Sequence, residues 1–319
     1  MNAQIPVTVL TGYLGAGKTT LLNRILTENH GKKYAVIVNE FGEVGIDNDL
    51  VVGADEEVFE MNNGCICCTV RGDLIRILSG LMKRKDKFDA ILIETTGLAD
   101  PAPVAQTFFV DQDVSARAKL DAIITVADAK HLLQRLEDSH EAAEQIAFAD
   151  VILLNKCDLM TEDELSAIEA LIRRMNATAT IHRTTKCDIS LDRVLGRGAF
   201  DLDRILEIEP NFLGEDDHEH DADIRSISLS TDRPIDGEKF ILWMRRLLAD
   251  QGKDLLRAKG IFDIQGDDRR LVMQSVHMLL DWDFQREWRA GERRNSRLVL
   301  IGRNLDDDTL RTGFNTCAA

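Results

Sequence analysis

The sequence is short of basic residues, and this shortage restricts the partners of the protein. Its 319 residues include 39 lysines and arginines against 55 aspartates and glutamates, so the formal net charge is −16. A chain of this sign is repelled by the phosphodiester backbone of nucleic acids and by anionic membrane surfaces. We therefore expect no nucleic-acid partner and no membrane partner.

Long apolar runs are also lacking, and cysteines are few. The N-terminal residues 1–10 have no basic segment followed by an apolar stretch, as a signal peptide would have. No apolar run approaches the roughly 20 residues that span a membrane. Only six cysteines occur, and three of them lie within residues 65–68. Such a tight group suits metal or redox chemistry better than a disulfide framework, so we expect a cytoplasmic protein.

Short apolar runs alternate with helical patterns through the first two-thirds of the chain. The runs are continuously apolar, as expected for strands that are buried on both faces of a sheet. They lie at residues 7–10, 35–38, 91–93, 122–126 and 151–154, with helical patterns such as 18–28 and 162–175 between them. This order predicts an α/β fold in which helices wrap a mainly parallel sheet.

A second, smaller domain is predicted after an acidic linker. The chain is longer than one hydrophobic core usually organises. We predict a first domain at residues 1–206, a linker rich in Asp, Glu and His at 207–223, and an α+β domain at 224–319. Its strand patterns lie at 224–230, 271–277 and 297–301, and its helical patterns at 236–249 and 306–314. We expect Trp282, Phe284 and Trp288 in its core, and the alternative is a partner-docking surface.

Residues 12–19 carry the strongest motif, Gly-Tyr-Leu-Gly-Ala-Gly-Lys-Thr, between a strand pattern and a helical pattern. It matches the phosphate-binding P-loop, in which glycines bring backbone N–H groups onto phosphate oxygens. Lys18 can reach the outer phosphates, and the Thr19 hydroxyl can bind Mg²⁺. The residues predicted to bind the nucleotide phosphates are Gly12, Gly15, Ala16, Gly17, Lys18, Thr19 and Thr20.

The sequence Asn155-Lys156-Cys157-Asp158 follows a late strand and indicates guanine as the base. Asp158 would accept hydrogen bonds from the N1–H and 2-amino groups of guanine, which adenine cannot offer. Asn155 would bind the ring edge, and the stem of Lys156 would lie over the base. The alternative is a surface turn in which Asp158 caps a helix. Thr184 and Thr185 are weaker candidates for backbone contacts to the base.

A third nucleotide element is predicted where the strand at 91–93 ends. Glu94 could hold a Mg²⁺-bound water, and the N–H of Gly97 could sense the γ-phosphate. We assign catalytic roles to Lys18, Thr19 and Glu94. Of the acids near residues 40–49, we expect Glu43 to join the Mg²⁺ shell, although a solvated acidic loop explains any one of them nearly as well.

The sequence Cys65-Ile66-Cys67-Cys68 predicts a metal site or a redox site. In an extended segment Cys65 and Cys67 point the same way, and Cys68 joins them if the chain bends into a helix. Thiolates suit Zn²⁺, Cu(I) or tetrahedral Co²⁺, and three of them leave one position open for transfer of the ion. By chemistry alone, two alternatives taken together explain the three cysteines as well as a metal site does: inert buried thiols and a redox switch.

These four motifs together resemble the CobW-like GTPases, and residues 39–44 and 94–101 resemble the YjiA-type branch. The resemblance covers almost the whole chain, including a CobW-like C-terminal domain. It implies slow, metal-responsive GTP hydrolysis and a role in delivering zinc, cobalt or iron to an acceptor metalloprotein. It also implies nucleotide-dependent homodimers, and it favours metal at the cysteines. The His-rich linker of many members is reduced here to His218-Glu219-His220, which leaves the thiols as the main metal candidate.

We therefore predict a GTP-hydrolysing metallochaperone or metal insertase. The cysteines lie between the two regions that would respond to a γ-phosphate, so GTP would complete the metal site and hydrolysis would release the ion. The alternative is a GTP-dependent regulatory switch, in which the cysteines sense metal or redox state and a partner protein is bound without delivery.

Overall fold

The computed structural model describes residues 4–39, 58–61, 68–83, 88–198 and 224–319. The chain forms two compact units, one of residues 1–170 and 179–201 and the other of residues 171–178 and 202–319. The predicted linker at 207–223 lies outside the described residues. Within the described residues, no helix combines the length and the apolar character that a membrane crossing requires.

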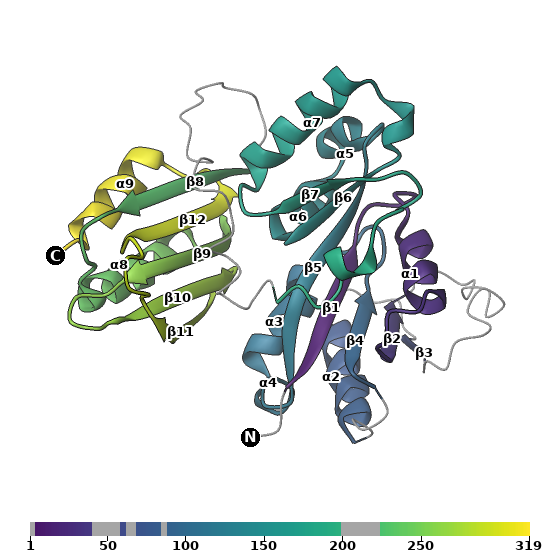
Figure 1. Cartoon of the computed structure of the whole chain (residues 1–319), viewed down its shortest axis with the longest axis horizontal. Coiled ribbons are helices and arrows are strands. Elements are labelled where there is room, and N and C mark those ends of the chain that lie inside the picture. Colours follow the sequence, from purple (N-terminus) through teal and green to yellow (C-terminus); the bar gives the residue numbers. More distant parts are fainter. Residues whose placement is uncertain (1–3, 40–57, 62–67, 84–87, 199–223) are drawn as a thin grey trace. The chain divides into compact units, whose positions relative to one another are not determined.

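The first unit contains a seven-stranded sheet in the order β3-β2-β4-β1-β5-β6-β7 (Figure 1). Every neighbouring pair is parallel, which confirms the predicted parallel sheet. The carboxyl ends of the central strands therefore meet at one edge, where ligands of open α/β sheets bind. The strands are β1 Ile5–Thr11, β2 Tyr34–Asn39, β3 Val58–Met61, β4 Ala90–Glu94, β5 Ala118–Asp128, β6 Val151–Asn155 and β7 Thr180–Arg183.

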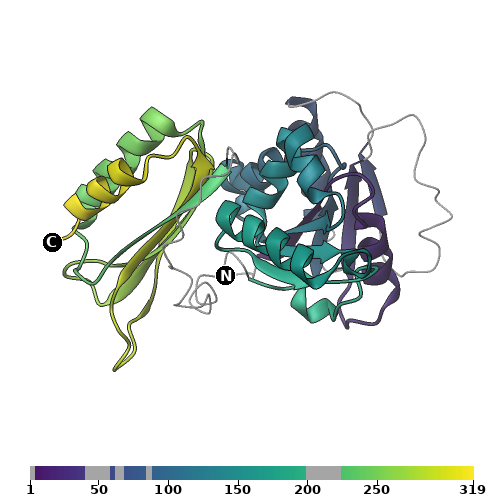
Figure 2. The same cartoon turned by 90° about the horizontal axis from the view of Figure 1, so that it is seen from above.

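Helices cover both faces of this sheet (Figures 1 and 2). Leu92 and Ile124 pack on one face in the same core cluster as Ile25 of the first helix. Ile93 and Ile123, which alternate with them, are equally buried, and this explains why the strands read as continuous apolar runs. The helices are α1 Lys18–Thr27, α2 Cys68–Met82, α3 Ala102–Val110, α4 Gln112–Ser115, α5 Leu132–Asp138, α6 His140–Phe148 and α7 Glu162–Met175.

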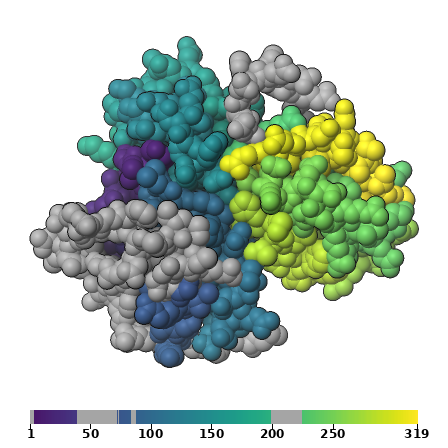
Figure 3. All heavy atoms as spheres, turned by 180° about the vertical axis from the view of Figure 1, so that it is seen from behind, coloured from purple at the N-terminus to yellow at the C-terminus, as the bar shows by residue number. Residues whose placement is uncertain are grey.

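The second unit contains a five-stranded antiparallel sheet in the order β11-β10-β9-β12-β8. Two helices cover one face of this sheet and enclose a core that contains Phe240, Phe262 and Phe314 (Figure 2). Figure 3 shows the atoms of this unit, coloured from green to yellow, packed closely together. This agrees with the predicted α+β fold. The elements are β8 Ile224–Thr231, α8 Gly237–Gln251, β9 Leu255–Asp263, β10 Arg269–Val276, β11 Leu279–Glu287, β12 Ser296–Arg303 and α9 Asp307–Thr316.

Two details of this unit correct the sequence analysis. The strands β9 and β11 were not predicted, because charged residues such as Arg257 and Asp281 interrupt their apolar pattern. Trp288 is buried as expected, but Trp282 and Phe284 are 40% and 36% exposed. Both lie on β11, an edge strand whose one neighbour among the described strands is β10, so their side chains have strand neighbours on one side alone.

Phe262 and Phe284 allow a matched test of this core. Phe262 is fully buried, with its ring centroid 4.4 Å from that of Phe240. We expect Phe262→Ala to lower the free energy of unfolding by about 3–5 kcal/mol, because it leaves a cavity. Phe284→Ala, on the same sheet, should cost about 1 kcal/mol or less. Chemical denaturation measures both, and equal losses would contradict the deeper burial of Phe262.

Candidate nucleotide site

The phosphate loop joins β1 to α1 and leaves no room for side chains at two of its glycines. Gly12 has φ +139°, and a Cβ there would lie 2.2 Å from the carbonyl oxygen of Val126. Gly17 has φ +119°, and its Cβ would lie 2.6 Å from Nδ2 of Asn155. The glycines of the motif thus let the loop lie directly against β5 and the end of β6.

Lys18 and Glu94 lie close enough in the fold for their charges to interact. Lys18 opens α1, and its Nζ donates to the carbonyl oxygens of Gly12 at 2.7 Å and Tyr13 at 3.3 Å. Burial lowers the pKa of Lys18, while the charge of Glu94 acts in the opposite direction. Glu94 is 6% exposed at the end of β4. Because the Lys18 ammonium donates to carbonyl oxygens of the phosphate loop, it lies against that loop. Phosphate oxygens of a bound nucleotide could replace these carbonyl oxygens as acceptors.

The segment that follows Glu94 lies against the phosphate loop. A Cβ at Gly97 would come within 2.7 Å of the backbone nitrogen of Leu14. The buried Gln145 of α6 donates through Nε2 to the carbonyl oxygens of Gly97 at 3.2 Å and Ala99 at 3.1 Å. Gln145 was not predicted, because no local pattern distinguishes it from a core-facing helix residue. The contact of Gly97 with a γ-phosphate stays a prediction.

Asn155 connects the phosphate loop to the loop that follows β7. The residue is 2% exposed at the end of β6, and its Nδ2 donates to the carbonyl oxygen of Ala16 at 2.9 Å. Its Oδ1 accepts from the backbone N–H of Cys187 at 2.9 Å and from Oγ1 of Thr184 at 3.2 Å. Both lone pairs of Oδ1 are then used inside the protein, which leaves only an N–H for the predicted contact with the base.

Lys156 is held by an acid that sequence reasoning did not single out. Its φ is +64°, and its Nζ donates to Oδ2 of Asp128 at 2.8 Å. Nδ1 of His131 lies 2.9 Å from the same oxygen. Burial raises the pKa of Asp128, but the bonds from Lys156 and His131 outweigh it and hold that pKa below its usual value. Asp158 follows in an exposed turn, where its carboxylate is accessible to a ligand.

The loop after β7 has an unusual backbone that neighbouring elements hold in place. Lys186 and Cys187 are consecutive non-glycine residues with φ of +54° and +55°, and such conformations cost about 1–3 kcal/mol each. The guanidinium of Arg24 on α1 donates to the carbonyl oxygen of Cys187. The thiol of Cys187 lies 3.4 Å from the carbonyl oxygen of Gly17, and burial raises its pKa to about 11. Sequence reasoning missed Arg24, because its pairing with Glu28 four residues on looks like an ordinary surface contact.

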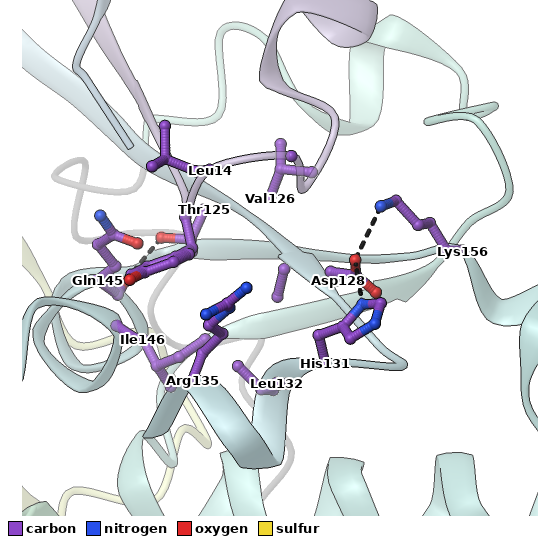
Figure 4. Close-up of a pocket in the computed structure, with 14 residues that line it drawn as sticks. Leu14, Thr125, Val126, Asp128, His131, Leu132, Arg135, Gln145, Ile146 and Lys156 are labelled. Carbon is purple, nitrogen blue, oxygen red and sulfur yellow. Dashed lines mark hydrogen bonds and ion pairs between the residues drawn. The ribbon is translucent and has the colours of Figure 1, made fainter. Parts of the chain in front are cut away.

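A cavity of about 240 Å³ lies beside the phosphate loop, between the end of β5 and helices α5 and α6 (Figure 4). Its polar lining includes Asp128, His131, Arg135 and Lys156. The guanidinium carbon of Arg135 lies 4.9 Å from the centroid of the Tyr13 ring. The sequence analysis did not predict this cavity, because its lining comes from four separate stretches of the chain, at residues 13–15, 125–135, 142–146 and 156.

The predicted metal ligands fall mostly outside the described residues. Glu43, Cys65 and Cys67 belong to that group, and of Cys68 only the backbone is described, as the first residue of α2. Within the described residues, no three or more His, Cys, Asp or Glu side chains gather as a metal site would require. The thiol site therefore stays a prediction. Thr19 is described and exposed, in the first turn of α1.

Comparison with known families decides the relationship of the chain. The family described as CobW/HypB/UreG, nucleotide-binding domain, matches residues 6–183. The chain belongs to the CobW/HypB/UreG family. The cobalamin synthesis protein CobW C-terminal domain matches residues 224–318. Both matches confirm the resemblance that the four motifs indicated.

Similar proteins span nearly the full length of this family member. The zinc chaperone YjiA of Escherichia coli is 38% identical, over 97% of this chain and 98% of the relative. The zinc chaperone CobW of Pseudomonas aeruginosa is 36% identical, over 99% and 92%. The zinc-regulated GTPase metalloprotein activator 1 of Schizosaccharomyces pombe is 34% identical, over 94% and 83%.

Two solved structures also match the fold. The Zn(II)-bound YjiA GTPase from E. coli has a TM-score of 0.80 and 34% identity, over 99% of this chain and 100% of that chain. A second structure, with the same TM-score and coverage, is a Zn(II)-bound triple mutant of YjiA in which one glutamate and two cysteines are replaced by alanine.

Arg24 gives a test of the loop after β7. We expect Arg24→Ala to weaken guanine-nucleotide binding roughly tenfold, because a charge-assisted hydrogen bond of ~1.5 kcal/mol that holds the strained loop is lost. Titration of a fluorescent GDP analogue measures this. Glu28→Ala is the control, because it removes the partner of Arg24 on α1 but leaves the bond to Cys187. Equal losses of nucleotide affinity in Arg24→Ala and Glu28→Ala would mean that Arg24 acts through its ion pair with Glu28 and not through the loop after β7.

Proposed function

We propose that this chain is a GTPase that controls the binding and delivery of a transition metal. The hydrogen bonds of Asn155 carry the proposal, because its one buried side-chain amide bonds both the phosphate loop and the loop after β7. The Asn-Lys-x-Asp motif that would read the base is thereby attached to the loop that would hold the phosphates. The names of the relatives, which are zinc chaperones and a zinc-regulated GTPase metalloprotein activator, support the same reading.

In the proposed hydrolysis, a water oxygen forms a bond to the γ-phosphorus while the bond from that phosphorus to the bridging oxygen of GDP breaks. The bridging oxygen keeps the electron pair, and the water proton leaves to solvent or to a phosphate oxygen. Lys18 and the backbone N–H groups of residues 15–19 bind the phosphates and stabilise the charge that builds on their oxygens. The neighbouring carboxylate of Glu94 favours the charged form of Lys18.

The residues around Lys18 also fit a Mg²⁺ ion. Thr19 presents an exposed hydroxyl one position after Lys18, and Glu94 places a carboxylate close enough to influence Lys18 from the neighbouring strand. Oxygen donors of these kinds suit Mg²⁺. Thr19 would hold the ion, Glu94 would hold a water bound to it, and Glu43 would be a further ligand. When bound, Mg²⁺ supplies positive charge against the β- and γ-phosphate oxygens.

The metal cargo would be bound by Cys65, Cys67 and Cys68. Helix α2 begins at Cys68, and a bend of the chain into this helix would bring the third thiol toward the other two. Zn²⁺ is the first candidate from the names and structures of the relatives, and Co²⁺ and Fe²⁺ are alternatives. The thiols lie in sequence between the acids near residue 43 and Glu94, so the nucleotide state would set metal affinity. An acceptor metalloprotein and a nucleotide-dependent homodimer complete the proposal.

A second function is a regulatory switch in which the same thiols sense metal or redox state and a partner is bound without delivery. The vicinal thiols favour it, because such groups oxidise readily. Identification of the bound protein separates the two functions. A pull-down in the GTP state that recovers a metalloprotein and loads it with metal supports delivery, whereas a partner that gains no metal supports the switch.

Asp158 tests the guanine assignment. We expect Asp158→Ala to lower GTP affinity on the order of a hundredfold, because the N1–H and 2-amino donors of the base lose their acceptor. Inosine triphosphate lacks the 2-amino group, so the ratio of GTP to inosine triphosphate affinity should fall as well. Calorimetric titration measures both ligands. The control is Asp163→Ala on the exposed first turn of α7, and an unchanged ratio in Asp158→Ala would remove Asp158 from base recognition.

The thiol site is tested by metal titration in each nucleotide state. With a GTP analogue, about one Co²⁺ per chain should bind with thiolate-to-metal absorption, and Cys67→Ser should abolish that band. Absorption is the informative readout, because a YjiA variant without two cysteines still has Zn(II) in its structure. Cys317→Ser, in the second unit, is the control and should bind Co²⁺ like the wild type.

The coupling has its own outcome in the same titration. Metal should bind more tightly to the complex with the GTP analogue than to the complex with GDP. By linkage, bound metal should raise the affinity for the analogue relative to GDP by the same factor. Equal metal affinities in the two states would contradict nucleotide control. Retention of the thiolate band in Cys67→Ser would contradict the three-thiol site.

A further inference from the structure

The cavity beside the phosphate loop has features that the proposed recognition of the base and of Mg²⁺ does not use. Tyr13, Leu14 and Gly15 of the loop form one wall, and α5 and α6 form the opposite wall (Figure 4). Its volume of about 240 Å³ lies below the roughly 300–1,000 Å³ of pockets for drug-sized ligands. The cavity therefore has room for a small ion beside the loop but not for a second nucleotide.

Arg135 is the cation of this cavity that has no anion beside it among the described residues. Its guanidinium carbon lies over the ring of Tyr13, 4.9 Å from the ring centroid, and the residue is half-buried. Asp128 is the one carboxylate in the described lining, and a single oxygen of it already accepts from Lys156 and lies beside His131. Of the Asp, Glu, Lys and Arg side chains that line the cavity, Asp128 brings one negative charge, whereas Lys156 and Arg135 bring two positive charges.

This positive charge is unexpected in a chain of net charge −16. A half-buried cation attracts an anion more strongly than a cation in open water does, because the local dielectric constant is lower. The guanidinium carbon of Arg135 lies over the Tyr13 ring, and the N–H fork of an arginine matches two oxygens of a phosphoryl group. Tyr13, Leu14 and Gly15 belong both to the phosphate loop and to the cavity lining. An anion bound beside this loop would therefore be a phosphoryl group.

We propose that Arg135 binds a phosphoryl oxyanion in this cavity, either the γ-phosphate of GTP on the phosphate loop or the inorganic phosphate formed from it. The proposal rests on the proposed GTPase function. It makes Arg135 a second cation, besides Lys18, for the terminal phosphate. An arginine aimed at a transferred phosphoryl group stabilises the charge that it carries.

The test compares Arg135→Gln with Lys130→Gln. Both changes remove one positive charge from the same stretch of chain, but Lys130 is exposed and does not line the cavity. Calorimetry measures the affinities of GDP and of a non-hydrolysable GTP analogue, and ³¹P NMR measures the binding of inorganic phosphate to the GDP complex. GDP affinity should change less than twofold in both variants, because GDP has no γ-phosphate.

Two results support the proposal and distinguish the two sources of the phosphoryl group. A roughly tenfold loss of affinity for the GTP analogue in Arg135→Gln alone means that Arg135 binds the γ-phosphate of the nucleotide. Loss of inorganic phosphate binding with unchanged analogue affinity means that it holds the product. Arg135→Lys should recover part of the loss in either case, since it keeps the charge but not the fork.

Other results overturn the proposal. If Arg135→Gln and Lys130→Gln behave alike for both the analogue and inorganic phosphate, Arg135 binds no phosphoryl group. A fall in GDP affinity equal to the fall in analogue affinity would show that Arg135 only supports the loop. If the wild type binds no guanine nucleotide, the proposed function fails, and inorganic phosphate titrated into the free protein still decides whether Arg135 binds this anion.

Discussion

The buried amide of Asn155 is the interaction on which the rest of the candidate site depends. It satisfies the carbonyl of Ala16, the N–H of Cys187 and the hydroxyl of Thr184 at once. A buried polar group without a partner costs about 1–3 kcal/mol, so loss of this one side chain would leave several groups of two loops unsatisfied. The phosphate loop and the loop after β7 cannot shift independently while the amide is in place.

Several strained or crowded backbone positions are maintained around this amide. Gly12 and Gly17 adopt conformations in which a side chain would collide with Val126 and Asn155. Lys156, Lys186 and Cys187 have positive φ without being glycine. Such positions persist only where the surroundings over-determine them, and they concentrate at functional sites. Here the surroundings are Asn155, Asp128 and Arg24, which lie on three different elements of the first unit.

Charge is distributed unevenly in this acidic protein. Lys18, Lys156 and Arg135 converge on the phosphate loop, and the carboxylates nearest to them, Glu94 and Asp128, are engaged with these cations. The site can therefore attract a polyanion although the whole chain carries −16. The proposed metal cargo would then be controlled from a place where the terminal phosphate of the nucleotide is sensed by more than one cation.

The sequence by itself determined the parallel sheet, the phosphate loop and the family, because these depend on contiguous residues: apolar runs of strand length, glycines at required turns, and motifs at strand ends. The tertiary structure alone decided that Asn155 braces two loops, that Asp128 holds Lys156, and that Arg24 and Arg135 face the site. These residues come from separate elements with no local signature, and they meet only because a parallel sheet brings its carboxyl ends to one edge. The exposure of Trp282 and Phe284 was also decided by the tertiary structure. Aromatic residues favour burial, but β11 lies at the edge of its sheet, where both side chains remain partly exposed.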